Sequence, residues 1–490
     1  YENGLPEIYQ LPLAFATEPL SSNLIENCHD AIMARLRIKG EDSLLYDALF
    51  AYDFQQAIII NMANHEHILQ HSNEVYFSGN GILKNSLDIQ DKIKPKILSI
   101  QRNNMAIAFN NLFFLKVYRQ IDRSINPDAE ISHFLTTYTG FQFAPKFLGT
   151  IEWKSDIGSL VLGMLQNMVE SNSDAWTFIL DKLDIFNERI LSHSAILPPP
   201  SAEPIGSLLS PVPYESIPAD IKEFIDGTTA ELIHLLGSRT GEMHQALASR
   251  TDIADFKPED YSLHYQRSLF AGFQSLVRGS FQNLNRSIKN LPAEIVEEAT
   301  YVLSMKEDIL AAFRKIYEHK ITVSRIRIHG DFQLSRVLFT GKDVVITDFE
   351  GEPMRSFSER RLKRSALRDT ASMVRSFHYA AFASLFLDNQ IRNEDFDKLI
   401  PFLDQWAHYI SSIFMDSYLE AVKNTTLIPK NKSDAQILIN AFLLEKMLHE
   451  LNYEISHRPN WAIIPLRGIK AILKKDARPP FVEDKIHLPL

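Results

Sequence analysis

Two carboxylates in the second half of the chain each follow a short apolar segment of strand length. Asp331 comes shortly after Arg325–Ile328, and Asp348 follows Val344–Thr347, 17 positions further along. The hairpin predicted between them is tight, which would bring both carboxylates to neighbouring strand ends facing one cleft. A single aspartate is more often a turn residue that ends a strand. The combination of His-Gly-Asp with a strand-ending Asp-Phe-Glu favours a catalytic pair instead.

The chemistry that suits such a pair is phosphoryl transfer from ATP, which depends on positioning and charge stabilisation more than on covalent help. Asp331, with His329 two positions before it, is the predicted catalytic group that accepts or orients the acceptor hydroxyl. Asp348 is the predicted ligand of Mg²⁺, because hard oxygen donors suit that ion. The predicted cofactors are therefore ATP and Mg²⁺.

A lysine within an apolar strand pattern supplies the cation that the nucleotide phosphates need. Lys116 lies in Phe113–Tyr118, and Glu130 follows 14 positions later on a helix predicted to begin at Pro127. We expect these two side chains to pair, as the equivalent lysine and glutamate do in kinases; a solvent-facing edge-strand lysine is the alternative. Gln166 ends the predicted hinge Met164–Gln166, whose backbone would contact adenine, unless this segment is simply a buried strand end.

The elements that must position these residues change character along the chain. Up to about residue 165 the sequence mixes strands and helices, and from Asp174 onward long stretches have helical periodicity, interrupted by a small β insert. A Pro- and Ser-rich stretch, Pro198–Pro213, is predicted to be a loop. We predict an α+β, bilobal protein-kinase-like fold. Its predicted parts are an N-terminal cap subdomain at 1–95, a kinase-like N-lobe at 96–170, and a helical C-lobe at 171–490 with the catalytic insert at 325–350.

The predicted strands are Ile8–Phe15, Ala57–Ile60, Met105–Phe109, Leu112–Tyr118, Phe147–Trp153, Leu160–Met164, Arg325–Ile328, Val337–Phe339 and Val344–Thr347. The predicted helical stretches are Asp174–Leu191, Ile221–Ala248, Leu263–Leu291 and Pro292–Glu318, with helices resuming at Arg368.

Composition limits the class of partner. The net charge of −10 argues against a nucleic-acid surface, because such surfaces concentrate Lys and Arg. The single cysteine, Cys28, excludes an internal disulfide and favours a reducing compartment. No apolar run reaches the length of a membrane span, and the first residues lack the pattern of a secretory signal. We expect a cytoplasmic protein that acts on a small molecule, with neither nucleic acid nor membrane as partner.

Several long segments resemble bacterial maltokinases, which occur alone or as the C-terminal half of trehalose synthase–maltokinase fusions and are related to aminoglycoside phosphotransferases. The likeness covers nearly the whole chain. The segments that carry it are His329–Leu338, Asp348–Pro353, Ser358–Ser365, Glu7–Phe15, Gly237–His244, Tyr265–Ser268, Leu444–Lys446, Leu451–Glu454, Arg458–Pro459 and Pro465–Gly468.

This resemblance implies ATP-dependent phosphorylation of maltose to maltose 1-phosphate in trehalose and glycogen metabolism. It also implies a trehalose synthase as partner or as a fused domain upstream of Tyr1. It lifts four residues to acceptor-contact candidates: Tyr379, Glu445, Lys446 and Tyr453. Lys446, Glu450 and Glu454 share one face of the predicted helix. The alternative for this face is a solvated row of salt bridges.

The chain departs from the resembled family directly after Asp331. The family has His two positions after that aspartate and Gly-Gln at the fourth and fifth, whereas this chain has Gln333, Ser335 and Arg336. Arginine has only donors and cannot coordinate a metal, so Arg336 would either repel the ion or replace its charge by contacting phosphate. An active kinase is the favoured interpretation. A pseudokinase that serves as a binding or scaffold module, or a kinase for another sugar such as glucosamine, stays open.

Overall fold

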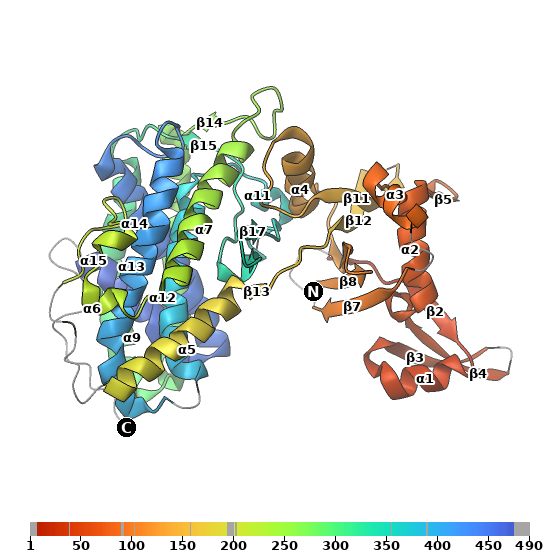
Figure 1. The fold of residues 1–490 in the computed structure, drawn as a ribbon, viewed down its shortest axis with the longest axis horizontal. Coiled ribbons are helices and arrows are strands. Elements are labelled where there is room, and N and C mark those ends of the chain that lie inside the picture. The colour runs from red at the N-terminus through yellow and green to blue at the C-terminus, as the bar shows by residue number, and fades with distance from the viewer. Residues whose placement is uncertain are drawn as a thin grey trace. The chain divides into compact units, whose positions relative to one another are not determined.

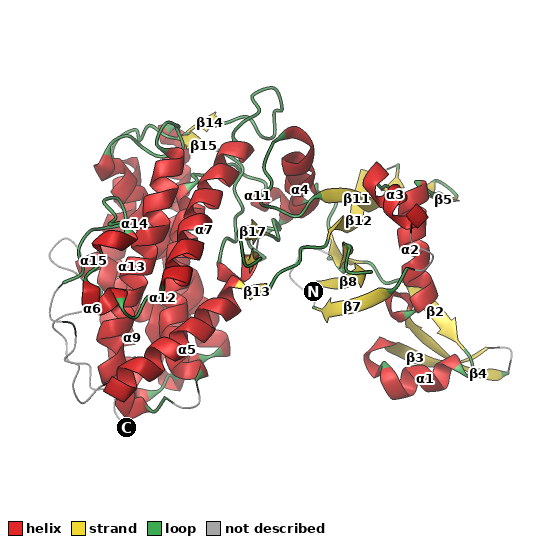
Figure 2. Cartoon of the chain, in the orientation of Figure 1, coloured by secondary structure: helices red, strands yellow, loops and turns green. Residues whose placement is uncertain are grey.

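The computed structural model describes residues 7–474, except 39, 90–92, 102, 157, 194–199, 201–202, 354 and 389–390. Contacts divide the chain into two compact units, which we describe separately (Figure 1). The N-terminal unit comprises Tyr1–Glu170 with Pro353–Arg361, and the C-terminal unit comprises Ser171–Glu352 with Leu362–Leu490. Strands dominate the first unit and helices the second, as the α+β prediction requires (Figure 2).

The N-terminal unit is built on a seven-stranded antiparallel sheet with the strand order β5-β6-β11-β12-β9-β8-β7. Its strands are β5 (His67–Gln70), β6 (Asn73–Phe77), β7 (Pro95–Ile100), β8 (Asn104–Phe109), β9 (Phe113–Tyr118), β11 (Phe147–Ser155) and β12 (Gly158–Asn167). The β8–β9 hairpin turns at Asn110 and Asn111, both in the left-handed region, and the amide of Leu112 closes the turn on the carbonyl oxygen of Phe109. The four strands predicted between Met105 and Met164 are confirmed.

The rest of this unit consists of a smaller sheet, a strand pair and helices. Strands β2 (Leu13–Ala16), β3 (Ile32–Ile38) and β4 (Glu41–Asp47) form a three-stranded sheet, and β1 (Ile8–Tyr9) pairs with β10 (Gln120–Ile121). The helices are α1 (Leu20–Asn27), α2 (Tyr52–Asn64), α3 (Gly81–Ile89), α4 (Pro127–Tyr138) and α11 (Phe357–Arg360).

Two strand predictions in this region need correction. Ala57–Ile60 lies inside α2, where Ile58 and Ile59 are buried against the sheet; a four-residue apolar run alone cannot separate a strand from a buried helix turn. Ile8–Phe15 divides into β1 and the start of β2. The predicted cap boundary at residue 95 falls within one sheet, because β5 and β6 lie in the same sheet as the strands after it.

The C-terminal unit is a helical assembly that carries a small sheet. Its helices are α5 (Ala175–His193), α6 (Ala219–Lys222), α7 (Gly227–Leu247), α8 (Leu263–Ser287), α9 (Ala293–Ser304), α10 (Lys306–Arg314), α12 (Leu367–Leu387), α13 (Phe396–Val422), α14 (Lys432–His457) and α15 (Ile463–Lys474). The four predicted helical stretches are confirmed, the second and the last of them each as two helices. Of the predicted loop Pro198–Pro213, residues 198–199 and 201–202 lie outside the described residues.

The β insert positions the two aspartates of interest. Strands β13 (Ser173–Asp174), β16 (Val337–Phe339) and β17 (Val344–Ile346) form a three-stranded sheet, and β14 (Glu259–Asp260) pairs with β15 (Ser324–Arg325). The predicted strand Arg325–Ile328 is shorter than expected, since only Arg325 lies in β15 and Ile326 adds a single bridge to Arg364. No helix in the described part of the chain combines the length and hydrophobicity of a membrane span.

Candidate active site

The segments that carry Asp331 and Asp348 touch each other within the C-terminal unit. Gly330 has φ +85°, and a Cβ added there would lie 3.2 Å from the Cα of Gly351. Asp348 follows β17 with φ +60°, a left-handed conformation that is strained for a residue with a side chain. The close approach of the two turns therefore requires glycine at 330 and holds Asp348 in an unusual conformation.

His329 joins the two segments rather than facing a substrate. Its ring is 1% exposed. Its Nε2 lies 2.9 Å from the carbonyl oxygen of Thr347, and the amide of Asp331 lies 3.4 Å from its Nδ1. A carbonyl accepts and an amide donates, so the ring carries its proton on Nε2 and both nitrogens are occupied. Both ring nitrogens of His329 thus contact backbone groups of the chain, and its catalytic role stays a prediction.

Arg336 is the cation between the two aspartates. It lies at the end of one 3-10 turn, Leu334–Arg336, directly before β16. Its Nη2 donates to Oδ2 of Asp331 at 3.3 Å, and its Nη1 donates to Oδ2 of Asp348 at 3.2 Å. Burial opposes its charge, but Asp348 and Asp331 outweigh burial and raise the pKa of Arg336 further above its ordinary value. The guanidinium thus stays charged at every accessible pH.

This arrangement fits one magnesium ion better than two. Asp348 and Glu350 each present a carboxylate oxygen, and these oxygens lie within 4.8 Å of each other. That donor set suits a hard cation. The position of a second ligand, five residues after Asp331, is filled by Arg336, which offers only donors. Any ion at Asp348 would also share that carboxylate with the guanidinium.

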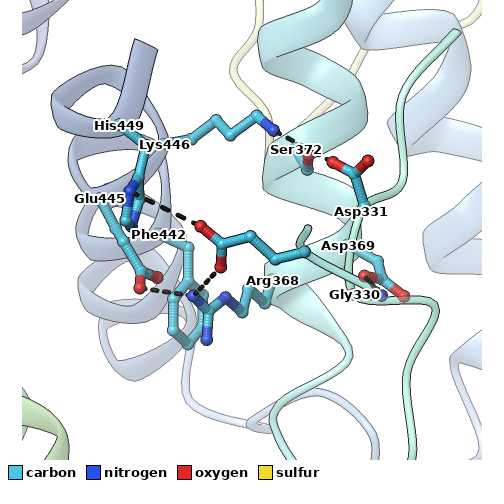
Figure 3. Close-up of a pocket in the computed structure, with 10 residues that line it drawn as sticks. Gly330, Asp331, Arg368, Asp369, Ser372, Phe442, Glu445, Lys446 and His449 are labelled. Atoms are coloured by element: carbon cyan, nitrogen blue, oxygen red, sulfur yellow. Dashed lines mark hydrogen bonds and ion pairs between the residues drawn. The ribbon is translucent and has the colours of Figure 1, made fainter. Parts of the chain in front are cut away.

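A cavity opens beside Asp331 (Figure 3). Lys446 on α14 reaches toward Asp331, with its Nζ 3.7 Å from Oδ1. Arg368 on α12 contacts both Glu445 and Glu352. The residues that line the cavity are Gly330, Asp331, Glu352, Arg368, Asp369, Ser372, Phe442, Glu445, Lys446 and His449.

Two of the four predicted acceptor residues, Glu445 and Lys446, therefore lie with Asp331. Sequence reasoning missed Glu352, Arg368 and His449 as cavity residues. Of these three, only His449 had a readable signal, because Phe442, Glu445 and His449 follow helical spacing on α14.

The other two acceptor candidates lie elsewhere on the same helices. The hydroxyl of Tyr379 donates to Glu454 at 2.6 Å and accepts from Arg458 at 3.0 Å. Burial, together with Glu454, raises the pKa of Tyr379 above its usual range. Tyr453 is 52% exposed and stacks on His457 with the ring centroids 4.3 Å apart. Neither tyrosine lines the cavity. Tyr453 lies about two helical turns beyond Glu445 on α14, and Tyr379 lies about three turns beyond Arg368 on α12.

The N-terminal unit places Lys116 on β9, between β8 and β12. The side chain is 5% exposed, and its Nζ contacts Oδ2 of Asp128 at 3.0 Å. Tyr118 donates to the same oxygen at 3.0 Å. Glu130, the predicted partner, is gripped by both Nε and Nη2 of Arg361, at 2.9 and 2.6 Å. We therefore assign Asp128 as the acid that anchors Lys116. Residues two apart on a helix point about 200° away from each other, so Asp128 and Glu130 serve different neighbours.

Gln166 corresponds to the alternative that the sequence left open, a buried strand end. It lies in β12 between Phe114 of β9 and Phe147 of β11. Its side chain donates to Ser132 at 3.1 Å. The amides of Asn167 and Met168 donate to the carbonyls of Lys146 and Leu112, so neither amide is available for adenine. The contact of Gln166 with nucleotide stays a prediction.

Comparison with known proteins agrees with the kinase-like architecture. The chain superimposes on a solved "Glucosamine kinase in complex with glucosamine, ADP and inorganic phosphate" with a TM-score of 0.59 and 13% identity, over 88% of this chain and 85% of that one. A second glucosamine kinase structure, crystal form A, gives 0.58 and 13% over 88% and 83%. At this identity the likeness concerns the fold alone, and it confirms the predicted protein-kinase-like fold.

Sequence similarity leads to the same group of enzymes. The chain is 26% identical to a glucosamine kinase of Mycolicibacterium smegmatis over 197 residues, 38% of this chain and 46% of that protein. It is 26% identical to a glucosamine kinase of Streptacidiphilus jiangxiensis over 145 residues, 29% of this chain and 30% of that protein. The matches thus span less than half the length of these curated relatives. No family model matches the chain.

Proposed function

We propose that this chain is an ATP-dependent sugar kinase whose preferred acceptor is an amino sugar of the glucosamine type. The observation that carries the proposal is the cavity that places Asp331 beside Glu445, Lys446 and Arg368. The similarity to glucosamine kinases supports the reaction class. Maltose, which the sequence resemblance suggests, is the competing acceptor.

Asp331 is the group that we assign to the acceptor hydroxyl. It would accept a hydrogen bond from that hydroxyl and take its proton while the new P–O bond forms and the β–γ bridging bond of ATP breaks. Lys446 and Arg336 contact the carboxylate from two sides. Lys116, anchored by Asp128, is the cation we assign to the nucleotide phosphates. A magnesium ion held by Asp348 and Glu350 would neutralise phosphate charge when bound.

The charge of the cavity favours an amino sugar over a neutral sugar. Asp331, Glu352 and Glu445 outnumber Arg368 and Lys446, even when the fully buried Asp369 is left out of the count. An excess of negative charge in a partly enclosed site stabilises an ammonium group. A neutral disaccharide gains nothing from that excess.

The decisive experiment is an ADP-release assay with glucosamine, glucose and maltose, each run with Mg²⁺ and with Mn²⁺. We expect glucosamine to have the highest kcat/KM. Asp331→Asn should abolish turnover, whereas Asp252→Asn, a matched change at an exposed aspartate that pairs with Arg250, should retain wild-type turnover. Glu445→Gln should raise KM for glucosamine by about tenfold or more, as for the loss of a charged contact, and should change KM for glucose far less. Equal losses with both sugars would contradict the amino-sugar assignment.

A second function, a non-catalytic binding module, is favoured by one specific observation. Arg336 occupies both aspartates at once, as an internal ion that replaces a metal would do. If the chain binds ATP with Mg²⁺ but releases no ADP with any sugar, the kinase proposal fails and the binding module is preferred. The association with a trehalose synthase stays a prediction, and co-purification with that enzyme tests it.

A further inference from the structure

The segment Gly237–His244 on α7 plays no part in the chemistry proposed above, although it is one of the most distinctive in the chain. Its two glycines let α7 approach α13. A Cβ at Gly237 would lie 2.2 Å from the carbonyl oxygen of Phe414, and one at Gly241 would lie 2.5 Å from the Cβ of Ala421. Two polar side chains of the same segment, Arg239 and His244, leave the helix toward the β insert and the segment after Ile328.

His244 supports the turn that carries Asp331 through one intermediate carboxylate. Its Nε2 lies 3.1 Å from Oδ2 of Asp369 on α12. The same carboxylate accepts hydrogen bonds from the amide of His329 at 2.8 Å and from the amide of Gly330 at 3.0 Å. Burial opposes a charge on Asp369, but its hydrogen bonds with His244 and Gly330 hold the pKa of that carboxyl below its ordinary value. The backbone just before Asp331 is therefore fixed to a buried, ionised group.

The opposite face of the His244 ring is also occupied. Nδ1 lies 3.1 Å from the hydroxyl of Tyr418 on α13, and His244 is fully buried. Because a carboxylate only accepts, the ring donates from Nε2 to Asp369, while its Nδ1 is bonded to the Tyr418 hydroxyl. Tyr418, His244 and Asp369 thus form a chain of hydrogen bonds that ends on the amides of His329 and Gly330.

Arg239, about one and a half helical turns earlier, supports the other limb of the site. Its Nε and Nη2 donate to the two oxygens of Asp343, at 3.0 and 2.8 Å. Asp343 lies in the turn of the β16–β17 hairpin, immediately before the strand that leads to Asp348. A two-pronged arginine–carboxylate pair fixes orientation as well as distance. Glu242 accepts a hydrogen bond from Nη1 of Arg239 at 2.7 Å, which holds the guanidinium in place.

We propose that α7 is the positioning element of the site: His244, through Asp369, sets the turn that carries Asp331, and Arg239, through Asp343, sets the hairpin that carries Asp348. One rigid helix then determines the separation of the two aspartates. That these aspartates serve phosphoryl transfer rests on the proposed function. The support of the two segments by α7 does not.

Amide hydrogen exchange of the full chain, followed by mass spectrometry, tests the inference without requiring turnover. The variants are His244→Leu, His244→Gln and Arg239→Met, with His234→Gln as the matched control, since His234 is an exposed histidine on the same helix. In His244→Leu we expect peptides over 326–333 to exchange about tenfold faster or more, because a charged acceptor loses one of its donors. In Arg239→Met the acceleration should appear over 340–348.

The glutamine variant separates positioning from loss of structure. Its side-chain amide can still donate to Asp369, so exchange over 326–333 should return most of the way to the wild-type rate. Where turnover is measurable, His244→Leu should lower kcat by about 10- to 100-fold, with the KM for ATP changed less than threefold. His234→Gln should match the wild-type chain in every readout.

Two results would overturn the inference: unchanged exchange over 326–333 in His244→Leu, or equal acceleration of all peptides in the leucine and glutamine variants. A wild-type chain that never releases ADP would count against the proposed function alone. The exchange pattern would still decide the role of α7.

Discussion

Replacing Arg336 by glutamine is the most informative perturbation of this site. The substitution removes the guanidinium that bridges Asp331 and Asp348 and puts an acceptor oxygen at the position five residues after Asp331. We expect the variant to bind a divalent cation more tightly than the wild-type chain, because Asp348 is released and a second oxygen ligand becomes available. Its Mg²⁺-dependent kcat should rise by about tenfold.

The magnitude follows from the two contacts. At the 3.2 Å that separates Nη1 of Arg336 from Oδ2 of Asp348, the gross attraction is about 5 kcal/mol for an effective dielectric constant of about 20. Desolvation offsets much of it, so that a hydrogen bond to a charged group contributes about 1.5–3 kcal/mol net. A cation that binds Asp348 in the wild-type chain must overcome this contact. Its removal should therefore tighten binding by about 10- to 100-fold.

Electron paramagnetic resonance of Mn²⁺, titrated into the chain with and without ADP, measures this directly. Arg336→Met removes the charge without adding an oxygen and should give an intermediate affinity. Arg336→Lys keeps the charge but loses the planar fork that spans both carboxylates, and should stay near the wild-type affinity. If all four proteins bind Mn²⁺ equally, Arg336 does not compete with the metal and the reasoning is refuted.

Three further perturbations test other parts of the structure. Lys116→Met should weaken ATP binding by about 10- to 100-fold, measured by calorimetry, while Lys154→Met on β11 leaves it unchanged. Gly330→Ala should lower the free energy of unfolding by about 1–3 kcal/mol in urea titrations, because its φ of +85° disfavours a side chain. The control Gly279→Ala in α8 should not lower the free energy of unfolding. Burial raises the pKa of Asp404 to about 7, from an ordinary value of 3.8. The folded chain therefore holds this proton more tightly than the unfolded chain, and the free energy of unfolding should fall between about pH 4 and pH 7 by up to about 4 kcal/mol. Asp404→Asn should flatten that slope, and identical urea midpoints for variant and wild type at pH 5 and at pH 8 would contradict the assignment.

The sequence predicted those elements whose signals are local. The β8–β9 hairpin has an Asn-Asn turn between two apolar runs, and α4 has Asn126 as its N-cap followed by Pro127, so both were readable from the chain alone. Ala57–Ile60 was misread because its helical periodicity depends on residues on both sides of a short apolar run. The extent of the seven-stranded sheet was not readable either, since the pairing of β6 with β11 joins residues more than 70 positions apart.

The site was predictable where chemistry dictated residue type, and not where packing chose among similar residues. Asp331, Asp348 and Lys116 stood out because a polar group followed or interrupted an apolar strand. The choice between Asp128 and Glu130 depends on the rotation of α4 about its axis, which spacing along the chain does not define. His244 and Asp369 lie 125 positions apart, and nothing local to either indicates the pair.

The row of charges on α14 shows how a correct periodicity can still give the wrong environment. Lys446, Glu450 and Glu454 recur at helical spacing and resemble a solvated stripe, yet Glu445, Glu450 and Glu454 each bond a residue of α12. Their partners are Arg368, Arg375 and Tyr379.

Because both members of each successive pair advance toward the C-terminus, α12 and α14 run parallel along this seam. A slip of one turn would leave buried charges unpaired, which costs several kcal/mol for each, so the pairs fix the register of the two helices. That register brings Glu445 and Lys446 to Asp331 and leaves Tyr379 at the far end. The pairing of α12 with α14 thus divides the acceptor candidates between the cavity and the far end. The charge pattern of α14 alone could not reveal this, because it does not show which helix packs against α14.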